Sequence, residues 1–148
     1  MDPREYVFEV GMDETEIREA LDRAETGVLA LAAGDDAYAF PVAFVYEDET
    51  VFLRLGRTSA STKHRYLDRT DTACFTCYDV DADGVSWSVV ATGPIEVLPV
   101  SDQDRFDEDR VTDEFLDLRV FGEAVEDLEV ELYALEVERL VGRRTPGA

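Results

Sequence analysis

The fold is set by VLALAAGDDAYAFPVAFVYEDETVFLRL, residues 28–55. Three apolar runs of strand length alternate here with the acidic turn sequences GDD and EDE; the runs are 28–33, 37–46 and 50–55. Short apolar runs joined by a few turn-forming residues are typical of β-hairpins. This stretch therefore predicts a meander of three antiparallel strands.

An amphipathic helix precedes these strands. From Asp13 to Glu25 the apolar residues recur at spacings of three and four, which places them on one face of a helix. Asp13 is a predicted N-cap, with Glu16 three residues later, and Gly27 is a predicted stop. The helix is therefore expected to lead directly into the first strand.

Further elements follow the meander. The pattern predicts a short helix that is capped by Ser59 or Ser61 and ends at about Arg69. It then predicts two strands joined by the turn DADG, a helical segment and a closing strand, at residues 72–80, 85–98, 101–118 and 130–141. Six strands joined mainly by hairpins, with apolar residues on both faces, favour a closed antiparallel barrel over an open sheet. We therefore expect one domain, residues 1–148, that is mainly β with flanking helices.

The charge of the chain describes its solvent more than its chemistry. Asp and Glu number 35 against 14 Lys and Arg, which gives a net charge of −21. Such a protein repels nucleic acid and anionic membranes, so neither is an expected partner. The carboxylates are spread over every segment, which is the pattern of a halophilic protein in concentrated salt. No apolar run is long enough to span a membrane and no basic leader precedes one, so we expect a cytoplasmic protein.

The basic residues single out one position. Thirteen of the 14 are arginine, and the only lysine, Lys63, stands beside the only histidine, His64. Lys63 follows the hydroxyl-rich run TSAST, residues 58–62. Hydroxyls, backbone N–H groups at a helix start and an ammonium can together hold a phosphate, although chance alone could also place one lysine here.

Two cysteines form the motif C-x-x-C. Cys74 and Cys77 lie in a strand-like run, where residues three apart point to opposite faces. No second Cys pair exists, and one histidine cannot complete a usual zinc site. Buried cysteines are therefore favoured over a redox dithiol or a metal site, and we expect no metal.

The order of these elements, with three local motifs, resembles the FMN-binding split-barrel proteins of the pyridoxamine 5'-phosphate oxidase-like family. The first motif is the hairpin of Gly27–Leu31 and Tyr38–Tyr46, which includes a Pro-Val strand. The second is the strand Val51–Gly56, which runs into Ser61–Lys63. The third is the strand Trp87–Gly93. The resemblance implies a six-stranded antiparallel split β-barrel, in a haloarchaeal-type member of the family.

The resemblance also implies a homodimer with FMN in a groove between the subunits. By position, the phosphate would contact Arg54, Ser61, Thr62 and Lys63; the isoalloxazine ring would lie along Pro41, Val42 and Ala43, partly through backbone groups; and Trp87 and Ser88 would approach from the partner subunit or border the ring. Alternation supports Arg54 independently, because it leaves Phe52 and Arg54 on the strand face opposite the apolar residues 51, 53 and 55. A cation there needs an anionic partner, which is either a phosphate or one of the many carboxylates.

Two residues keep alternative roles. His64 could act as a general acid or bind iron, as in haem-degrading relatives of this barrel, but a surface or capping role is favoured because nothing in the sequence orients it. Trp87 could stack on a flavin or belong to the core. No catalytic residue is assigned. The later part of the chain does not resemble a true pyridoxamine phosphate oxidase, so that activity is not expected.

Three functions remain open at this stage. The leading hypothesis is an FMN-dependent oxidoreductase that passes a hydride or electrons from a reduced nicotinamide or similar donor to a small acceptor. The second is a non-catalytic cofactor-binding or sensing barrel that holds FMN, a deazaflavin or haem. The third is a purely structural barrel dimer in which Lys63 has no special role.

Overall fold

The computed structural model describes residues 10–57, 62–98 and 129–146. Within these ranges the elements are, in chain order, β1 (Val10–Gly11), α1 (Glu14–Arg23), β2 (Thr26–Ala33), β3 (Asp36–Glu47), β4 (Thr50–Arg57), α2 (Thr62–Leu67), β5 (Thr72–Val80), β6 (Ser86–Val97), β7 (Glu129–Glu136) and β8 (Arg139–Arg144). The predicted helical segment at 101–118 and the capping residues Ser59 and Ser61 lie outside the described residues.

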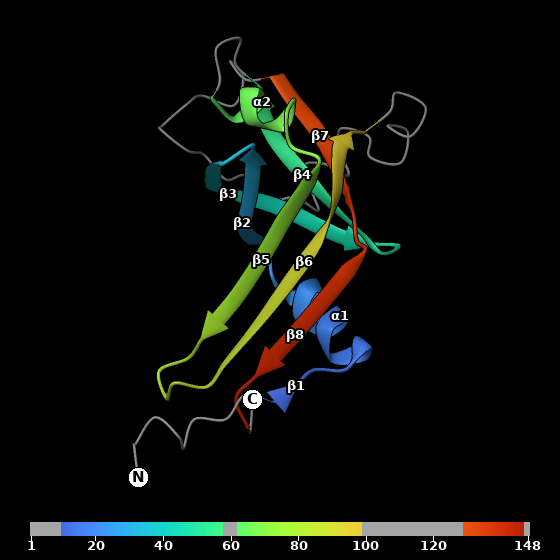
Figure 1. Cartoon of the computed structure of the whole chain (residues 1–148). Coiled ribbons are helices and arrows are strands. Elements are labelled where there is room, and N and C mark those ends of the chain that lie inside the picture. The colour runs from blue at the N-terminus through green and yellow to red at the C-terminus, as the bar shows by residue number, and fades with distance from the viewer. Residues whose placement is uncertain (1–9, 58–61, 99–128, 147–148) are drawn as a thin grey trace.

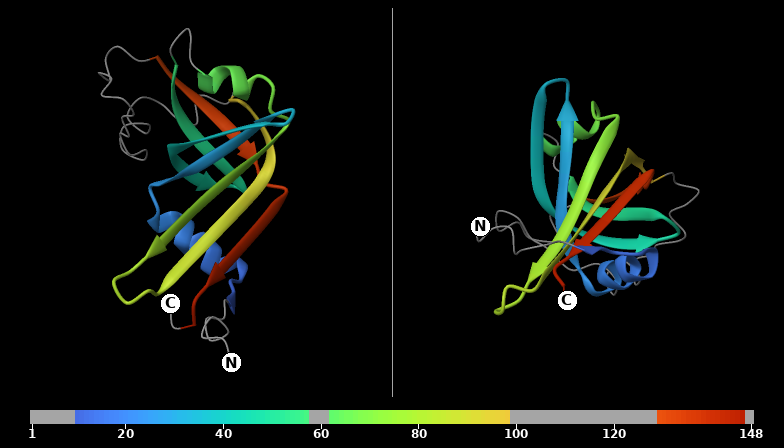
Figure 2. Two further views of the ribbon diagram at one scale, coloured as in Figure 1. Left: turned by 60° about the vertical axis from the view of Figure 1, so that its left-hand side comes forward. Right: turned by 60° about the horizontal axis from the view of Figure 1, so that its bottom comes forward.

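Six of the strands close into a barrel. They pair in the order β6-β5-β2-β3-β4-β7, and β7 then pairs back onto β6, where Leu135 lies opposite Ile95. Every pairing is antiparallel. β8 continues the sheet from the free part of β6, and the short β1 pairs with β8 (Figures 1 and 2). The predicted mainly β, six-stranded antiparallel barrel is therefore confirmed.

The prediction of a single closing strand at 130–141 is wrong, because this segment forms two separate strands, β7 and β8. β7 pairs with β4 and with the end of β6, whereas β8 pairs with the first half of β6. At the break, the Glu138 N–H donates to the Thr92 carbonyl over 2.9 Å. A Cβ at Gly93 would overlap the Glu136 carbonyl, so only glycine lets the chain pass at this point. Apolar residues on both faces of the segment thus mark two strands in two parts of the sheet.

The first helix begins as predicted and ends differently. The Glu16 N–H donates to Asp13 Oδ1 over 2.8 Å and the Asp13 N–H donates to Glu16 Oε1 over 3.3 Å, which forms a capping box. The helix ends at the C-cap Ala24, so the prediction of Gly27 as its stop is wrong. Gly27 lies inside β2, where a Cβ would overlap the Phe75 ring and the Thr76 carbonyl. Close packing of β2 on β5 therefore explains this glycine.

Apolar side chains form two clusters on the two sides of the barrel wall. The larger fills the interior and includes Leu29, Phe44, Leu53, Phe75 and Leu135, together with Ile17 and Leu21 of α1. The smaller lies outside β3, β4 and β7 and consists of Ala43, Phe52, Leu98 and Leu132. α1 covers the interior toward one end of the barrel and α2 lies at the other (Figure 1). None of the helices in the described ranges is long and apolar enough to cross a membrane.

Candidate functional site

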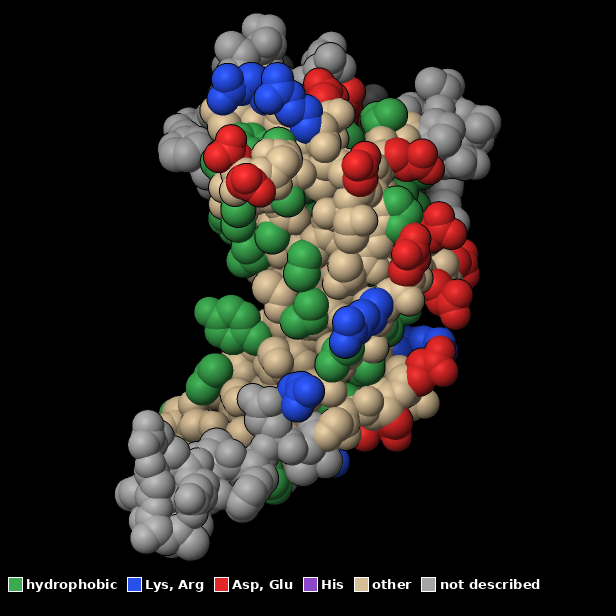
Figure 3. Space-filling view, viewed as in Figure 1, with side chains coloured by type: hydrophobic (Ala, Val, Ile, Leu, Met, Phe, Trp, Pro, Cys, Tyr) green, Lys and Arg blue, Asp and Glu red, His purple; other side chains and the backbone are tan. Residues whose placement is uncertain are grey.

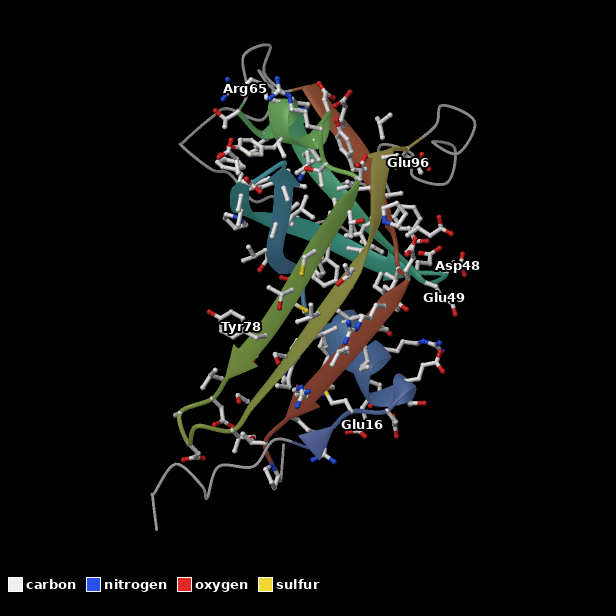
Figure 4. All side chains as sticks on the ribbon, viewed as in Figure 1. Glu16, Asp48, Glu49, Arg65, Tyr78 and Glu96 are labelled. Carbon is white, nitrogen blue, oxygen red and sulfur yellow. The ribbon has the colours of Figure 1, made fainter. Side chains whose placement is uncertain are left out.

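The candidate site lies at the barrel end where β4 leads toward α2 (Figures 1 and 4). Contacts of Tyr66 and Thr70 with β2 and β3 fix the position of α2 and of the residues after it. The rings of Tyr66 and Tyr38 stack with their centroids 5.1 Å apart. The buried Thr70 hydroxyl donates to the Tyr66 carbonyl over 2.6 Å and accepts from the Ala32 N–H over 3.2 Å. A helix of only six residues is therefore held to β2 and β3 by specific contacts.

Lys63 is half-buried on α2. Its Nζ lies 5.0 Å from the centroid of the Phe40 ring, at a distance typical of a cation–π contact. No Asp or Glu of the described ranges forms an ion pair with it, although the chain carries 35 of them. Lys and Arg side chains gather over α2 (Figure 3), where Arg65 and Arg69 follow Lys63 in sequence. The ammonium thus sits against an apolar ring with charge available for an anion.

Arg54 lies on β4, on the outside of the barrel. Its Cα partners are Ala43 of β3 and Leu132 of β7, both members of the smaller cluster. The side chain is half-buried, while Leu53 and Leu55 face the interior. The predicted alternation along β4 is therefore confirmed. β4 runs between β3, which Lys63 contacts through Phe40, and β7.

The three predicted ring-contact residues are divided by the strand alternation. Pro41 is exposed, and Ala43, two residues later in the strand, points to the same side. Both therefore lie on the outer side of β3, on which Arg54 also lies. The Val42 side chain is buried in the interior cluster. A ring on the outer side could therefore meet Val42 only through its backbone. Of the hydroxyl residues, Thr62 is exposed at the start of α2, and Ser61 lies outside the described residues.

Trp87 and Ser88 lie far along β6 from α2, near the hairpin that joins β5 to β6. Trp87 packs against the interior cluster and lines a groove of about 430 Å³ with Arg23, Thr26, Tyr78 and Asp79, among others. Ser88 has the opposite parity and lies opposite Tyr78. A single subunit therefore does not bring these two residues to Lys63 or Arg54.

Sequence reasoning missed a polar cluster beside Lys63. His64 Nε2 lies 3.2 Å from Glu131 Oε2, and the Tyr133 hydroxyl donates to the same oxygen over 3.2 Å. The His64 side chain is 15% exposed and that of Glu131 is 22% exposed. His64 Nδ1 is buried and has no hydrogen-bond partner. Because 67 residues separate His64 from Glu131, no local motif could reveal the pair; alternation in β7 was the one available signal.

This contact corrects the favoured surface or capping role of His64. The ring is largely buried and is oriented by a carboxylate. It is also poorly placed to bind haem iron, since Nε2 faces Glu131 and Nδ1 is buried.

The two cysteines follow the predicted alternation. Cys77 is buried in the interior cluster, whereas Cys74 is half-buried, and both thiols are free. Burial raises the pKa of the Cys77 thiol to about 12, which keeps it protonated and unreactive. Within the described residues no group of His, Cys, Asp and Glu side chains could hold a metal ion.

Comparisons with known proteins place this geometry in a family. A family model described as pyridoxamine 5'-phosphate oxidase matches residues 13–144. No curated protein matches the sequence.

Solved structures share the fold at low sequence identity. An FAD-binding protein from Mesorhizobium loti superposes with a TM-score of 0.71 at 17% identity, over 93% of this chain and 98% of that one. An FAD-binding protein from Mycobacterium smegmatis gives 0.67 at 20% identity, over 92% and 98%. An FAD- and haem-binding protein from M. smegmatis gives 0.69 at 18% identity, over 94% of this chain and 74% of that one.

Proposed function

The chain belongs to the pyridoxamine 5'-phosphate oxidase family, and from that premise we propose that it is an FMN-binding flavoprotein that acts as an oxidoreductase. Lys63 is the observation that carries the proposal. The only lysine of a strongly acidic chain lies half-buried over an apolar ring, with no carboxylate of the described residues paired to it. An ammonium held in this way is suited to an anionic cofactor group.

The described residues fit the two ends of such a cofactor. Lys63, Arg54 and Thr62 offer two cations and a hydroxyl, the donor set that a phosphate needs; Ser61 is the fourth proposed contact. Pro41 and Ala43 are small residues on the outer side of β3, next to Arg54, and leave room for a flat ring, with Val42 contributing backbone groups. A bound flavin would supply hydride or electron transfer, while these residues would bind it, orient it and exclude water.

We propose further that the protein is a homodimer and that Trp87 and Ser88 serve the site of the partner subunit. The support is a face of the sheet without a single carboxylate, here called the acid-free face. It consists of the outward residues Val28, Ala30, Cys74, Thr76, Tyr78, Ser88, Val90, Thr92, Val141 and Arg143 on β2, β5, β6 and β8.

Charge argues that a second copy covers the acid-free face. Tyr78 is 67% exposed and Val90 is 38% exposed, and the Asp and Glu side chains visible in Figure 3 lie around the edges of this face. Two chains of net charge −21 repel one another wherever carboxylates meet. A surface of apolar and uncharged polar residues without acids, with one arginine, is the surface on which two copies can approach, and a two-fold axis would present it to itself. Trp87 adjoins Ser88 at its margin.

We also propose that the protein is halophilic and cytoplasmic, and its acidic surface supports the halophilic part of this proposal. Carboxylates repel one another unless salt screens them, and the screening length falls to about 3 Å at 1 M salt. The melting temperature should therefore fall steeply when salt is dialysed away. A melting temperature that is unchanged between dilute buffer and multimolar KCl would contradict this proposal.

The flavin proposal is tested by the spectrum of the freshly purified protein in high salt. A yellow protein with flavin absorbance supports it, and chromatography of the released cofactor distinguishes FMN from FAD, deazaflavin or haem. Oxidation of a reduced nicotinamide with a dye acceptor then tests turnover; colour without turnover would favour a binding or sensing barrel. Colourless protein that takes up no added FMN would refute the proposal.

A further inference from the structure

We propose that His64 is a positioning residue that holds the Glu131 carboxylate and so keeps Lys63 available for the phosphate of the flavin. This inference rests on the proposed function. It concerns a pair that nothing in the sequence pattern joins: His64 Nε2 and Glu131 Oε2 are 3.2 Å apart, between α2 and β7.

Two neighbouring side chains on α2 extend to different strands. Lys63 extends to Phe40 on β3, whereas His64 extends to Glu131 on β7. β3 and β7 are the two strands that flank β4, which carries Arg54. Through these two side chains the short helix contacts both strands that neighbour β4, and a carboxylate lies at its β7 side.

The Glu131 carboxylate and the flavin phosphate are two anions that could compete for the Lys63 ammonium. A lysine side chain is long and flexible, and its compact ammonium pairs with whatever anion is nearest. Glu131 is a negative group beside the residue that follows Lys63, so a Glu131 carboxylate that lost its contact with His64 would have more freedom to compete with a phosphate for the ammonium and would also repel that phosphate. Held by His64 and by the Tyr133 hydroxyl at one oxygen, the carboxylate is kept on β7.

The hydrogen bonds at Glu131 decide which nitrogen of the His64 ring carries the hydrogen that points to the carboxylate. A carboxylate oxygen only accepts hydrogen bonds, and the Tyr133 hydroxyl donates to the same Oε2, so Nε2 must carry the hydrogen that points to Glu131. Nδ1 is left buried without a partner. A buried, unpaired nitrogen is unfavourable for stability alone, so its presence favours a role for the other ring nitrogen. His64 is thereby fixed in one orientation, with Glu131 as its partner.

The test compares binding of FMN with binding of riboflavin, which lacks the phosphate, by titration of the cofactor-free protein in high salt. For His64→Ala we expect the FMN Kd to rise about tenfold while the riboflavin Kd changes less than about twofold. His64→Gln, whose amide can still donate to the carboxylate, should lose less. Adding Glu131→Gln to His64→Ala should restore FMN affinity to within about threefold of the original protein, because the competing charge is gone.

Controls separate this inference from its premise. Glu14→Gln removes one exposed carboxylate of α1, at the other helix, and should leave both affinities unchanged. If the unmodified protein binds FMN no better than riboflavin, the proposed phosphate site fails. If it prefers FMN but His64→Ala keeps that preference, or the double variant is as weak as His64→Ala, the positioning role is wrong. Thermal melts establish which variants fold; should His64→Ala not fold, the same comparison is made with His64→Phe, which keeps a ring but cannot donate to the carboxylate, and with its Glu131→Gln double variant.

Discussion

The two helices of the described chain are held against the barrel in different ways. α1 has a capping box at its start and sends Ile17 and Leu21 into the interior cluster. α2 has six residues, of which only Leu67 is buried, and it is fixed by ring stacking, a cation–π contact and the His64–Glu131 pair. Apolar burial stabilises a helix without fixing any polar group. Directional contacts place particular side chains, which is what a binding site requires.

The strongest way to break this contrast is to empty the interior beneath α1. Leu21→Ala removes a side chain that is fully buried, and we expect it to lower the free energy of unfolding by about 2–5 kcal/mol. Denaturant unfolding in high salt measures the loss. FMN affinity of the folded variant should not change, because no proposed contact comes from α1. A large loss of FMN affinity would show that the two helices do not act separately.

A second variant tests whether a dimer brings Trp87 of one subunit to the proposed flavin site of the other. Val90→Asp places a carboxylate on the acid-free face, so we expect the dimer Kd to rise at least about tenfold, or about 1.4 kcal/mol, as measured by sedimentation. Trp87 is the only tryptophan, so its fluorescence reports directly on flavin binding, and its quenching by FMN should weaken in the same variant.

The matched control for the dimer is Val97→Asp. Val97 is also exposed and lies on β6, but it has the opposite parity and is not part of the acid-free face. It should leave association unchanged. Equal effects of the two substitutions would argue against this face as the interface.

The smallest expected effect concerns the barrel wall and appears only at high pH. The pKa of Cys77 is raised by burial to about 12, above its ordinary value of 9.0, so above pH 9 the unfolded chain loses this proton while the folded protein keeps it. The stability contributed by the protonated thiol is therefore complete below pH 9 and is lost as the pH rises toward 12.

Unfolding free energies measured between pH 8 and pH 11 check this sign. Burial also raises the pKa of Tyr46, which adds to the decline in every variant. Cys77→Ala should flatten part of the decline, whereas the matched variant Cys74→Ala should keep all of it. If the slopes of the two variants are the same, Cys77 ionises without hindrance in the folded protein.

Local patterns in the sequence predicted most of the strands and the start of α1. Hairpin turns and alternation are encoded within a few residues, and the predicted strand at 72–80 matches β5 in both bounds. The prediction failed at Gly27 and in the segment after Val130. In both places the local structure depends on a strand that is distant in sequence. Phe75 packs on Gly27, and the segment between β7 and β8 passes over Gly93, which faces Glu136.

The candidate site was predicted only in part, for the same reason. Lys63 and Arg54 were found because lysine is unique here and a charge interrupts an apolar strand. Glu131 was not found, because its pairing with His64 depends on the closure of β4 against β7. The separation of Trp87 from Lys63 within one subunit likewise follows from the length of β6 and could not be read from spacing.

Titration of the cofactor-free protein with FMN and with riboflavin tests the central claim most directly, in the original chain, in Lys63→Ala and in Arg54→Ala. We expect each substitution to weaken FMN binding by about 1.5–3 kcal/mol, the range for a hydrogen bond to a charged group, and to change riboflavin binding little. FMN affinity that is the same in all three proteins would contradict the assignment of these two cations to the phosphate.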